Sequence, residues 1–143
     1  MKNSRSRARE FALQGLYQWL LSGTEPTTIR AQLAETESFA HCDVKFFDRM
    51  WQGVTTEYEV LVAAISPFCD RNASQLSPIE KSVLVIGAWE LLRQPEVPYR
   101  VAINEAVELA KVYGGTDGHK FVNGVLDKLA AAARAPEISA ARA

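Results

Sequence analysis

The stretch from Val97 to Lys128 reads VPYRVAINEAVELAKVYGGTDGHKFVNGVLDK, and its pattern is the most informative in the chain. Apolar residues recur in it at three- and four-residue spacing, which predicts two amphipathic helices. Gly114 and Gly115 separate them, because glycine readily ends a helix. Charged and aromatic residues open the second helix. This composition favours a surface that binds a partner over a catalytic site.

Helical spacing also covers most of the chain on either side of this stretch, and no alternating strand pattern is present. The pattern predicts one all-α domain over residues 1–134. The alanine-rich tail over residues 135–143 is expected to be frayed and flexible. The expected helices cover approximately residues 4–21, 27–36, 43–65, 78–93, 99–113 and 117–133, with one more turn near 68–73.

The most apolar helix has a clear start. Ser77 is placed to cap it, Pro78 occupies its first position, and Glu80 stands where a capping box places a carboxylate. The helix that follows is apolar on all sides and is expected to be buried at the centre of the fold. Glu90 interrupts it, and we expect a paired structural group there, because no histidine or second carboxylate lies at a spacing useful for catalysis.

The composition is that of an ordinary globular domain, with 143 residues, 48% hydrophobic residues and a net charge of -1. No apolar run approaches the ~20 residues that span a bilayer, and no signal-peptide pattern follows the start. We therefore expect a cytoplasmic protein without membrane contact, in which Cys42 and Cys69 are reduced thiols. His41 and His119 lie far apart, and nucleotide-binding glycine motifs are missing, so no metal, cofactor or enzymatic activity is expected.

The first nine residues carry Lys2, Arg5, Arg7 and Arg9 and no acidic residue, although the whole chain has 17 acidic and 16 basic residues. A local basic segment favours an anionic partner, with nucleic acid ahead of lipid. On a helix, Lys2, Arg5 and Arg9 share one side and Arg7 faces the other way. We expect the arginines to overhang the core, although charges of this kind are also often merely solvated.

Arg7 shares its side of the first expected helix with Gln14 and Gln18, and Tyr17 lies at the edge of this polar face. Arginine binds phosphate through two parallel hydrogen bonds, and an exposed tyrosine can stack on an unpaired base. This face is therefore a candidate for contact with RNA.

The last expected helix carries a polar stripe of Lys120, Asn123 and Asp127, with Gly124 inside it and Phe121 at its flank. A glycine inside a helix costs ~1 kcal/mol relative to alanine, so it often marks a close approach by another backbone. Phe121 could stack on a base while Lys120 and Asn123 hold phosphate and base edge. Alternatively, Phe121 packs against a neighbouring helix and Gly124 permits tight helix packing.

Three segments of the chain resemble the NusB family of bacterial transcription antitermination factors. The resemblance extends over nearly the whole length, to about Lys128, and the longest segment is highly specific. The matching segments are RAREFALQGLYQW (Arg7–Trp19), PIEKSVLVIGAWEL (Pro78–Leu91) and the stretch quoted above.

The resemblance implies a fold of about seven helices in two packed sub-bundles and a role without catalysis. Members of this family pair with NusE, the small-subunit ribosomal protein that doubles as a transcription factor. The pair binds the boxA element of nascent, single-stranded RNA, particularly in ribosomal RNA leaders. It then helps to load an antitermination complex onto RNA polymerase.

The family's functional positions can be carried over residue by residue. Its protein-partner surface includes Glu80, which can also cap its own helix. Asp117 has an ordinary explanation as a helix cap, and its carboxylate would only tune phosphate binding. Ser4 and Ser6 interleave the arginines where many relatives have a denser arginine run. The RNA-binding positions fall on Lys2, Arg5, Arg7, Arg9, Tyr17, Asp117, Lys120, Phe121 and Asn123.

Two other functions remain open. Helical domains of this type also occur as accessory domains of RNA methyltransferases, although this chain shows no cofactor-binding domain. A helical protein-interaction module without RNA specificity of its own would form a complex with the ribosomal protein and add nothing to RNA binding.

Overall fold

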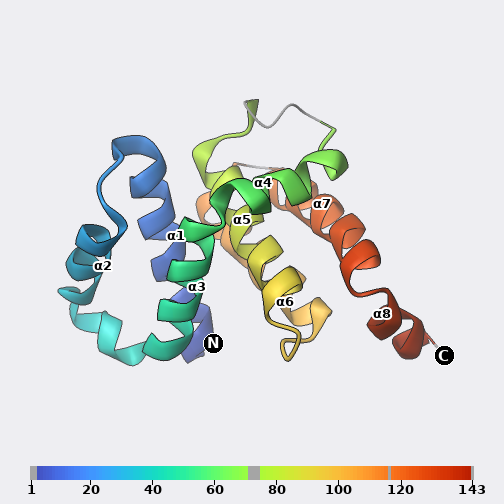
Figure 1. Cartoon of the computed structure of the whole chain (residues 1–143), viewed down its shortest axis with the longest axis horizontal. Coiled ribbons are helices and arrows are strands. Elements are labelled where there is room, and N and C mark those ends of the chain that lie inside the picture. The colour runs from blue at the N-terminus through green and yellow to red at the C-terminus, as the bar shows by residue number, and fades with distance from the viewer. Residues whose placement is uncertain (1–2, 71–74, 116, 143) are drawn as a thin grey trace.

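Eight α-helices and two short 3-10 helices make up the regular structure of residues 3–70, 75–115 and 117–142, which the computed structural model describes (Figure 1). No strand occurs among these residues, so the expected all-α fold is confirmed. The helices are α1 (Ser4–Ser22), α2 (Pro26–Ala34), η1 (Glu37–His41), α3 (Val44–Thr56), α4 (Tyr58–Ile65), η2 (Ser66–Phe68), α5 (Pro78–Arg93), α6 (Tyr99–Tyr113), α7 (Gly118–Ala133) and α8 (Ala135–Arg142).

The helices form two sub-bundles, as the resemblance implied (Figure 1). In the first, α1 packs against α2 and α3. In the second, α5, α6 and α7 pack on one another and α4 lies on α5. Because α1 and α3 also pack on α5, this helix joins the two halves. None of the described helices is long and apolar enough to cross a membrane.

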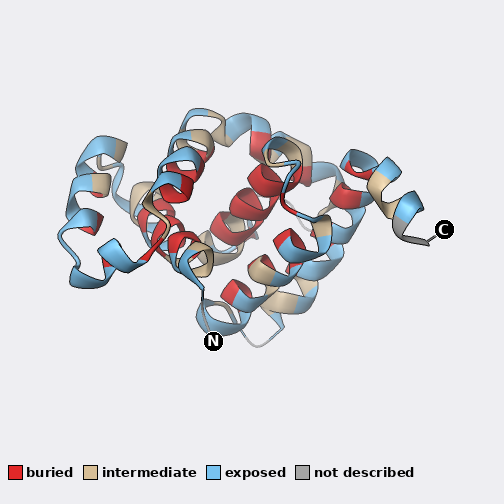
Figure 2. Cartoon of the chain, turned by 90° about the horizontal axis from the view of Figure 1, so that it is seen from below, coloured by how far each residue is buried: buried red, intermediate tan, exposed pale blue. Residues whose placement is uncertain are grey.

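The centre of the molecule is α5, whose residues from Ser82 to Leu91 are all buried (Figure 2). The sequence predicted this burial, because apolar side chains surround the helix on all sides. Its start is also as predicted: Pro78 occupies the first turn, and the Ser77 hydroxyl accepts a hydrogen bond of 3.1 Å from the Glu80 amide.

The single helix expected over residues 43–65 is instead two helices, α3 and α4, which break at Glu57. Thr55 and Thr56 explain the break, since their hydroxyls donate to carbonyls of the preceding turn, at Trp51 and Gln52. Such bonds compete with the helical ladder and bend helices. The apolar spacing continues across the break, so periodicity alone did not show it.

The chain after Arg134, which we expected to be frayed, forms the short helix α8. Arg134 is buried, and its guanidinium donates hydrogen bonds of 2.9–3.2 Å to four main-chain carbonyls at the end of α5 and in the loop after it. The last carbonyls of a helix have no partner of their own, so one cation here satisfies several of them. Glu137 of α8 then accepts from Arg134 at 2.6 Å and from the Tyr99 amide at 2.9 Å.

Candidate nucleic-acid interface

The exposed face of α1 carries Arg7, Gln14 and Tyr17, as the sequence predicted. Tyr17 is 38% exposed, which is unusual for a large aromatic side chain in this molecule. The Arg7 guanidinium makes no hydrogen bond or ion pair with any residue that the structure describes. This arginine is therefore available to an external anion. Lys2 lies outside the described residues.

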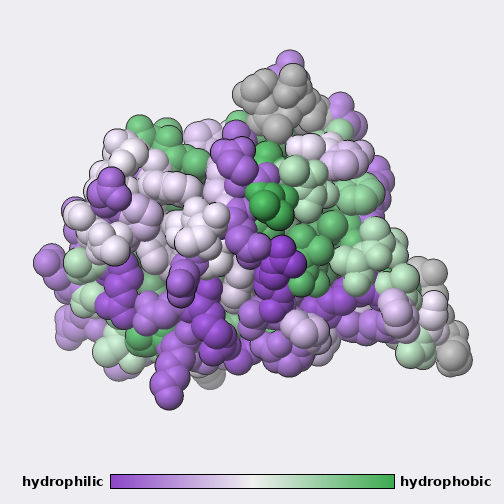
Figure 3. All heavy atoms as spheres, in the orientation of Figure 1, coloured by the Kyte–Doolittle hydropathy of each residue, from purple (hydrophilic) through white to green (hydrophobic). Residues whose placement is uncertain are grey.

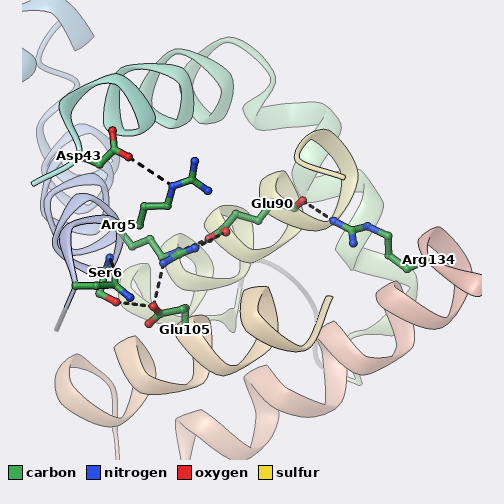
Figure 4. A network of polar contacts seen from close by, with 8 residues as sticks. Arg5, Ser6, Asp43, Glu90, Glu105 and Arg134 are labelled. Atoms are coloured by element: carbon green, nitrogen blue, oxygen red, sulfur yellow. Dashed lines mark hydrogen bonds and ion pairs between the residues drawn. The ribbon is translucent and has the colours of Figure 1, made fainter. Parts of the chain in front are cut away.

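Arg5 is partly committed to contacts within the protein. Its guanidinium lies over the ring of Phe46, 4.3 Å from the ring centroid, and its Nε is 3.5 Å from an oxygen of Asp43 (Figure 4). The side chain is 39% exposed. Arg5 can therefore reach a phosphate only in competition with Asp43.

Arg9 contradicts our expectation that all the arginines overhang the core, because it is only 2% exposed. Its Nε and Nη2 donate to the two oxygens of Glu90 at 2.5 and 2.8 Å, and its Nη1 donates to Glu105 at 3.0 Å (Figure 4). The side chain faces α5 because apolar residues of α1 on the same side bring this helix against α5. Arg9 is thus a structural cation without exposed surface for RNA.

Glu90 is the paired structural group that the sequence predicted. Burial raises the pKa of its carboxyl, and the hydrogen bonds and charge of Arg9 act in the opposite direction. The Arg9–Glu90 pair belongs to a larger polar network that reaches towards solvent. Glu105 accepts hydrogen bonds from Arg9 and from Ser6, the latter at 2.5 Å. This network fixes the start of α1 against α5 and α6.

The start of α7 presents a mixed set of groups. Lys120 and Asp117 are 74% and 77% exposed, and their charged groups lie 3.5 Å apart. Phe121 is half-buried against the core, with part of its ring accessible. Asn123 is exposed, but it lies roughly 160° around the helix from Phe121, so one base cannot contact both side chains.

Gly124 lies in open space, because a Cβ placed on it would meet no atom within 4 Å. The alternative that it permits tight packing against a neighbouring helix of this chain is therefore wrong.

Tyr113, at the end of α6, contacts the predicted surface of α1 a few residues before the start of α7. Its hydroxyl donates a hydrogen bond of 2.7 Å to Glu10 on α1, and its ring is 38% exposed. Asp117 is four positions after Tyr113, so their Cα atoms lie at most about 14 Å apart. The end of α6 therefore lies against the face of α1, and the start of α7 follows within a few residues along the chain. Sequence reasoning missed Tyr113, although an aromatic residue just before a glycine pair was a usable signal.

The hydrogen bond from Tyr113 to Glu10 also changes the acidity of the tyrosine. Together with partial burial and the negative charge of Glu10, it raises the pKa of Tyr113 to about 12. The hydroxyl therefore remains a donor at every physiological pH.

Glu80 lies at the first turn of α5 and beside the start of α7. A Cβ placed on Gly118 would be 3.9 Å from Glu80 Cγ. The proposed protein-partner position therefore adjoins the proposed RNA-binding cluster around Asp117.

The hydropathy of the surface differs from one region to another. Figure 3 shows hydrophilic side chains over the lower part of the view and apolar ones around α4.

Comparison with known proteins identifies the family. Residues 6–131 match the model described as the NusB family. The transcription antitermination protein NusB of Thiobacillus denitrificans is 54% identical over 142 residues, which cover 99% of this chain and 98% of the relative. The corresponding protein of Nitrosospira multiformis is 57% identical over 132 residues, covering 92% of this chain and 84% of the relative.

Solved structures agree. The structure of T. maritima NusB has a TM-score of 0.82 at 29% identity, covering 97% of this chain and 99% of that one. A structure of antitermination factors NusB and NusE in complex with dsRNA shares the fold, with a TM-score of 0.79 at 23% identity over 92% of this chain and 99% of that one. The chain therefore belongs to the NusB family of transcription antitermination proteins, which are not enzymes.

Proposed function

We propose that this protein binds the boxA element of nascent, single-stranded RNA together with the ribosomal protein NusE. The complex then helps to assemble an antitermination complex on RNA polymerase in the cytoplasm. In this account the protein acts as a scaffold: it holds RNA on one surface and the protein partner on an adjoining one.

The observation that carries this proposal is the contact between Tyr113 and Glu10. It joins the end of α6 to the face of α1 that carries the exposed Arg7 and Tyr17, and Lys120 and Phe121 follow shortly afterwards in the chain. Unpaired bases offer faces for stacking on Tyr17 and Phe121, and their phosphates can bind Arg7. Asp117 competes with phosphate for Lys120, which would limit affinity for RNA in general.

The solved relative that contains NusB and NusE with dsRNA supports an RNA-binding role for this fold. Glu80 is our proposed contact for the protein partner, because it is a carboxylate at a helix start beside the α7 cluster. Its amide remains bonded to Ser77, so the helix cap at Ser77 does not depend on the Glu80 side chain.

Alanine at Arg7 and alanine at Phe121 test the proposed RNA site. We expect each variant to bind a labelled boxA RNA about tenfold more weakly, since contacts to charged groups and base stacking each contribute about 1–3 kcal/mol. Fluorescence anisotropy measures the affinity, and circular dichroism checks the fold.

Arg100→Ala is the matched control, because Arg100 is exposed at the opposite end of α6 from Tyr113. It should bind RNA as the unchanged protein does. Unchanged affinity in both the Arg7 and the Phe121 variants would sink this assignment of the site.

A further inference from the structure

A polar hollow of about 340 Å³ lies between α1 and η1, and its η1 wall is outside the residues that the sequence assigned to RNA. One wall comes from the exposed face of α1. The other comes from the start of η1, a helix that sequence reasoning did not predict. The lining residues are Arg7, Glu10, Phe11, Gln14, Thr36 and Ser38.

The polar side chains of this hollow have unused hydrogen-bonding capacity. Arg7, Gln14, Thr36 and Ser38 make no side-chain hydrogen bond or ion pair with any other described residue. Thr36 begins η1, yet its hydroxyl does not cap that helix. Other polar groups nearby are engaged: Gln18 bonds to Gln32 at 2.9 Å, and Arg30 pairs with Asp48 at 3.1 Å.

The walls of the hollow are held in place by buried aromatic rings. Phe11 of α1 and Phe39 of η1 meet edge to face, with ring centroids 5.2 Å apart, and Phe39 meets Phe47 of α3 in the same way at 5.2 Å. Such ring pairs have a preferred geometry, so η1 keeps a defined position against α1. The hydroxyls of Thr36 and Ser38 are thus already beside Arg7 before any ligand binds.

We propose that this hollow binds the ribose-phosphate backbone of one RNA nucleotide. Arg7 pairs with its phosphate, and the hydroxyls of Thr36 and Ser38 donate hydrogen bonds to the phosphate or the 2′-hydroxyl. Glu10 also lines the hollow, and its carboxylate accepts the Tyr113 hydroxyl. One acidic neighbour suits a phosphodiester, which carries a single negative charge, better than a more highly charged free nucleotide. This inference rests on the proposed function and extends the RNA path from α1 to η1.

The double variant Thr36→Ala, Ser38→Ala tests the proposal, since it removes both hydroxyls from exposed positions. We expect the affinity for labelled, single-stranded boxA RNA to fall about 5- to 150-fold, as the loss of two ordinary hydrogen bonds predicts. Thr27→Ala, Thr28→Ala is the matched control, with two exposed hydroxyls removed from α2, and it should bind RNA normally. Thermal melting checks that both variants are folded.

A second comparison tests whether the hydroxyls and Arg7 hold the same nucleotide. Arg7→Ala should cost less affinity in the Thr36→Ala, Ser38→Ala background than in the unchanged protein, because groups that share a ligand are not additive. Ser38→Lys, which adds a positive charge to the same hollow, should tighten RNA binding.

The outcomes separate this inference from the proposed function. If the double variant and Ser38→Lys bind RNA like the unchanged protein while Arg7→Ala and Phe121→Ala bind weakly, the hollow is not an RNA subsite and the proposed function stands. If Arg7→Ala and Phe121→Ala also bind normally, the proposed function fails as well.

Discussion

Arg7 and Arg9 are two positions apart on α1 and therefore point roughly 160° apart around its axis. The difference decides their roles. Arg9 is buried and holds Glu90, whereas Arg7 is exposed and has no partner among the described residues. The arginines of the basic start therefore have two roles: Arg9 fixes α1 on the central helix α5, and Arg7 faces outward.

Arg9→Ala should destabilise the protein by about 3–5 kcal/mol at neutral pH, because it leaves the carboxylate of Glu90 buried without a partner. Removal of both charges, in Arg9→Met, Glu90→Met, should restore most of that loss. Urea unfolding measures both effects. A loss below about 1 kcal/mol in Arg9→Ala, as is usual for exposed ion pairs, would contradict the structural role.

The same variant has a defined pH dependence. Burial raises the pKa of the Glu90 carboxyl, so the folded state favours its protonated form. The contribution of Glu90 to the free energy of unfolding is thus greatest below the ordinary glutamate pKa, and it falls as pH rises above that value. The destabilisation of Arg9→Ala should therefore shrink as the solution is acidified towards that pKa.

Tyr113 should titrate at a pH of about 12, above the ordinary tyrosine value of 10. Because its pKa is raised in the fold, its link to α1 is fully present below pH 10 and is lost as pH rises towards 12. The difference in tyrosinate absorbance between the unchanged protein and Tyr113→Phe measures this titration. A pKa of 10 for Tyr113 would contradict the contact with Glu10.

At the scale of the helix, a substitution at Gly124 of α7 tests whether this position packs against the protein or faces open space. Gly124→Ala should stabilise the protein by up to ~1 kcal/mol, because alanine is the better helix former and the position is open. Gly87→Ala is the contrasting variant: its Cβ would lie 2.6 Å from Leu126 Cδ1, so it should destabilise. Thermal melting compares the two, and a destabilised Gly124→Ala would show that the open space is absent.

The sequence predicted the helices well where their own residues define them. The start of α5 was visible in Ser77 and Pro78, and its burial in an unbroken apolar run. The break at Glu57 was not visible, because it depends on threonine hydroxyls that bond to the preceding turn. Helix α8 was missed because its position depends on contacts of Arg134 with the distant end of α5.

The candidate site was predictable only in part for the same reason. Exposure of Arg7 and Tyr17 follows from their positions on an amphipathic helix. Burial of Arg9 depends on Glu90, which is far away in the sequence. Tyr113 and the residues of η1 join the site through the packing of separate helices, which no local pattern of residues records.

At the scale of the whole molecule, α5 connects the two sub-bundles and thereby fixes the two surfaces relative to each other. Its first turn carries Glu80 beside α7, and its later turns hold α1 through Glu90. The proposed protein contact and the proposed RNA contacts are therefore carried by elements that pack on the same central helix. A partner that binds at Glu80 lies next to RNA at the start of α7 and can contribute to holding it.

The most direct test of this account is the fluorescence anisotropy of labelled boxA RNA and of a scrambled RNA, each with and without the ribosomal protein NusE. The account predicts tighter binding of boxA than of the scrambled RNA, and a further gain for boxA when NusE is present. Equal binding of both RNAs, or a complex with NusE that adds no RNA affinity, would contradict it.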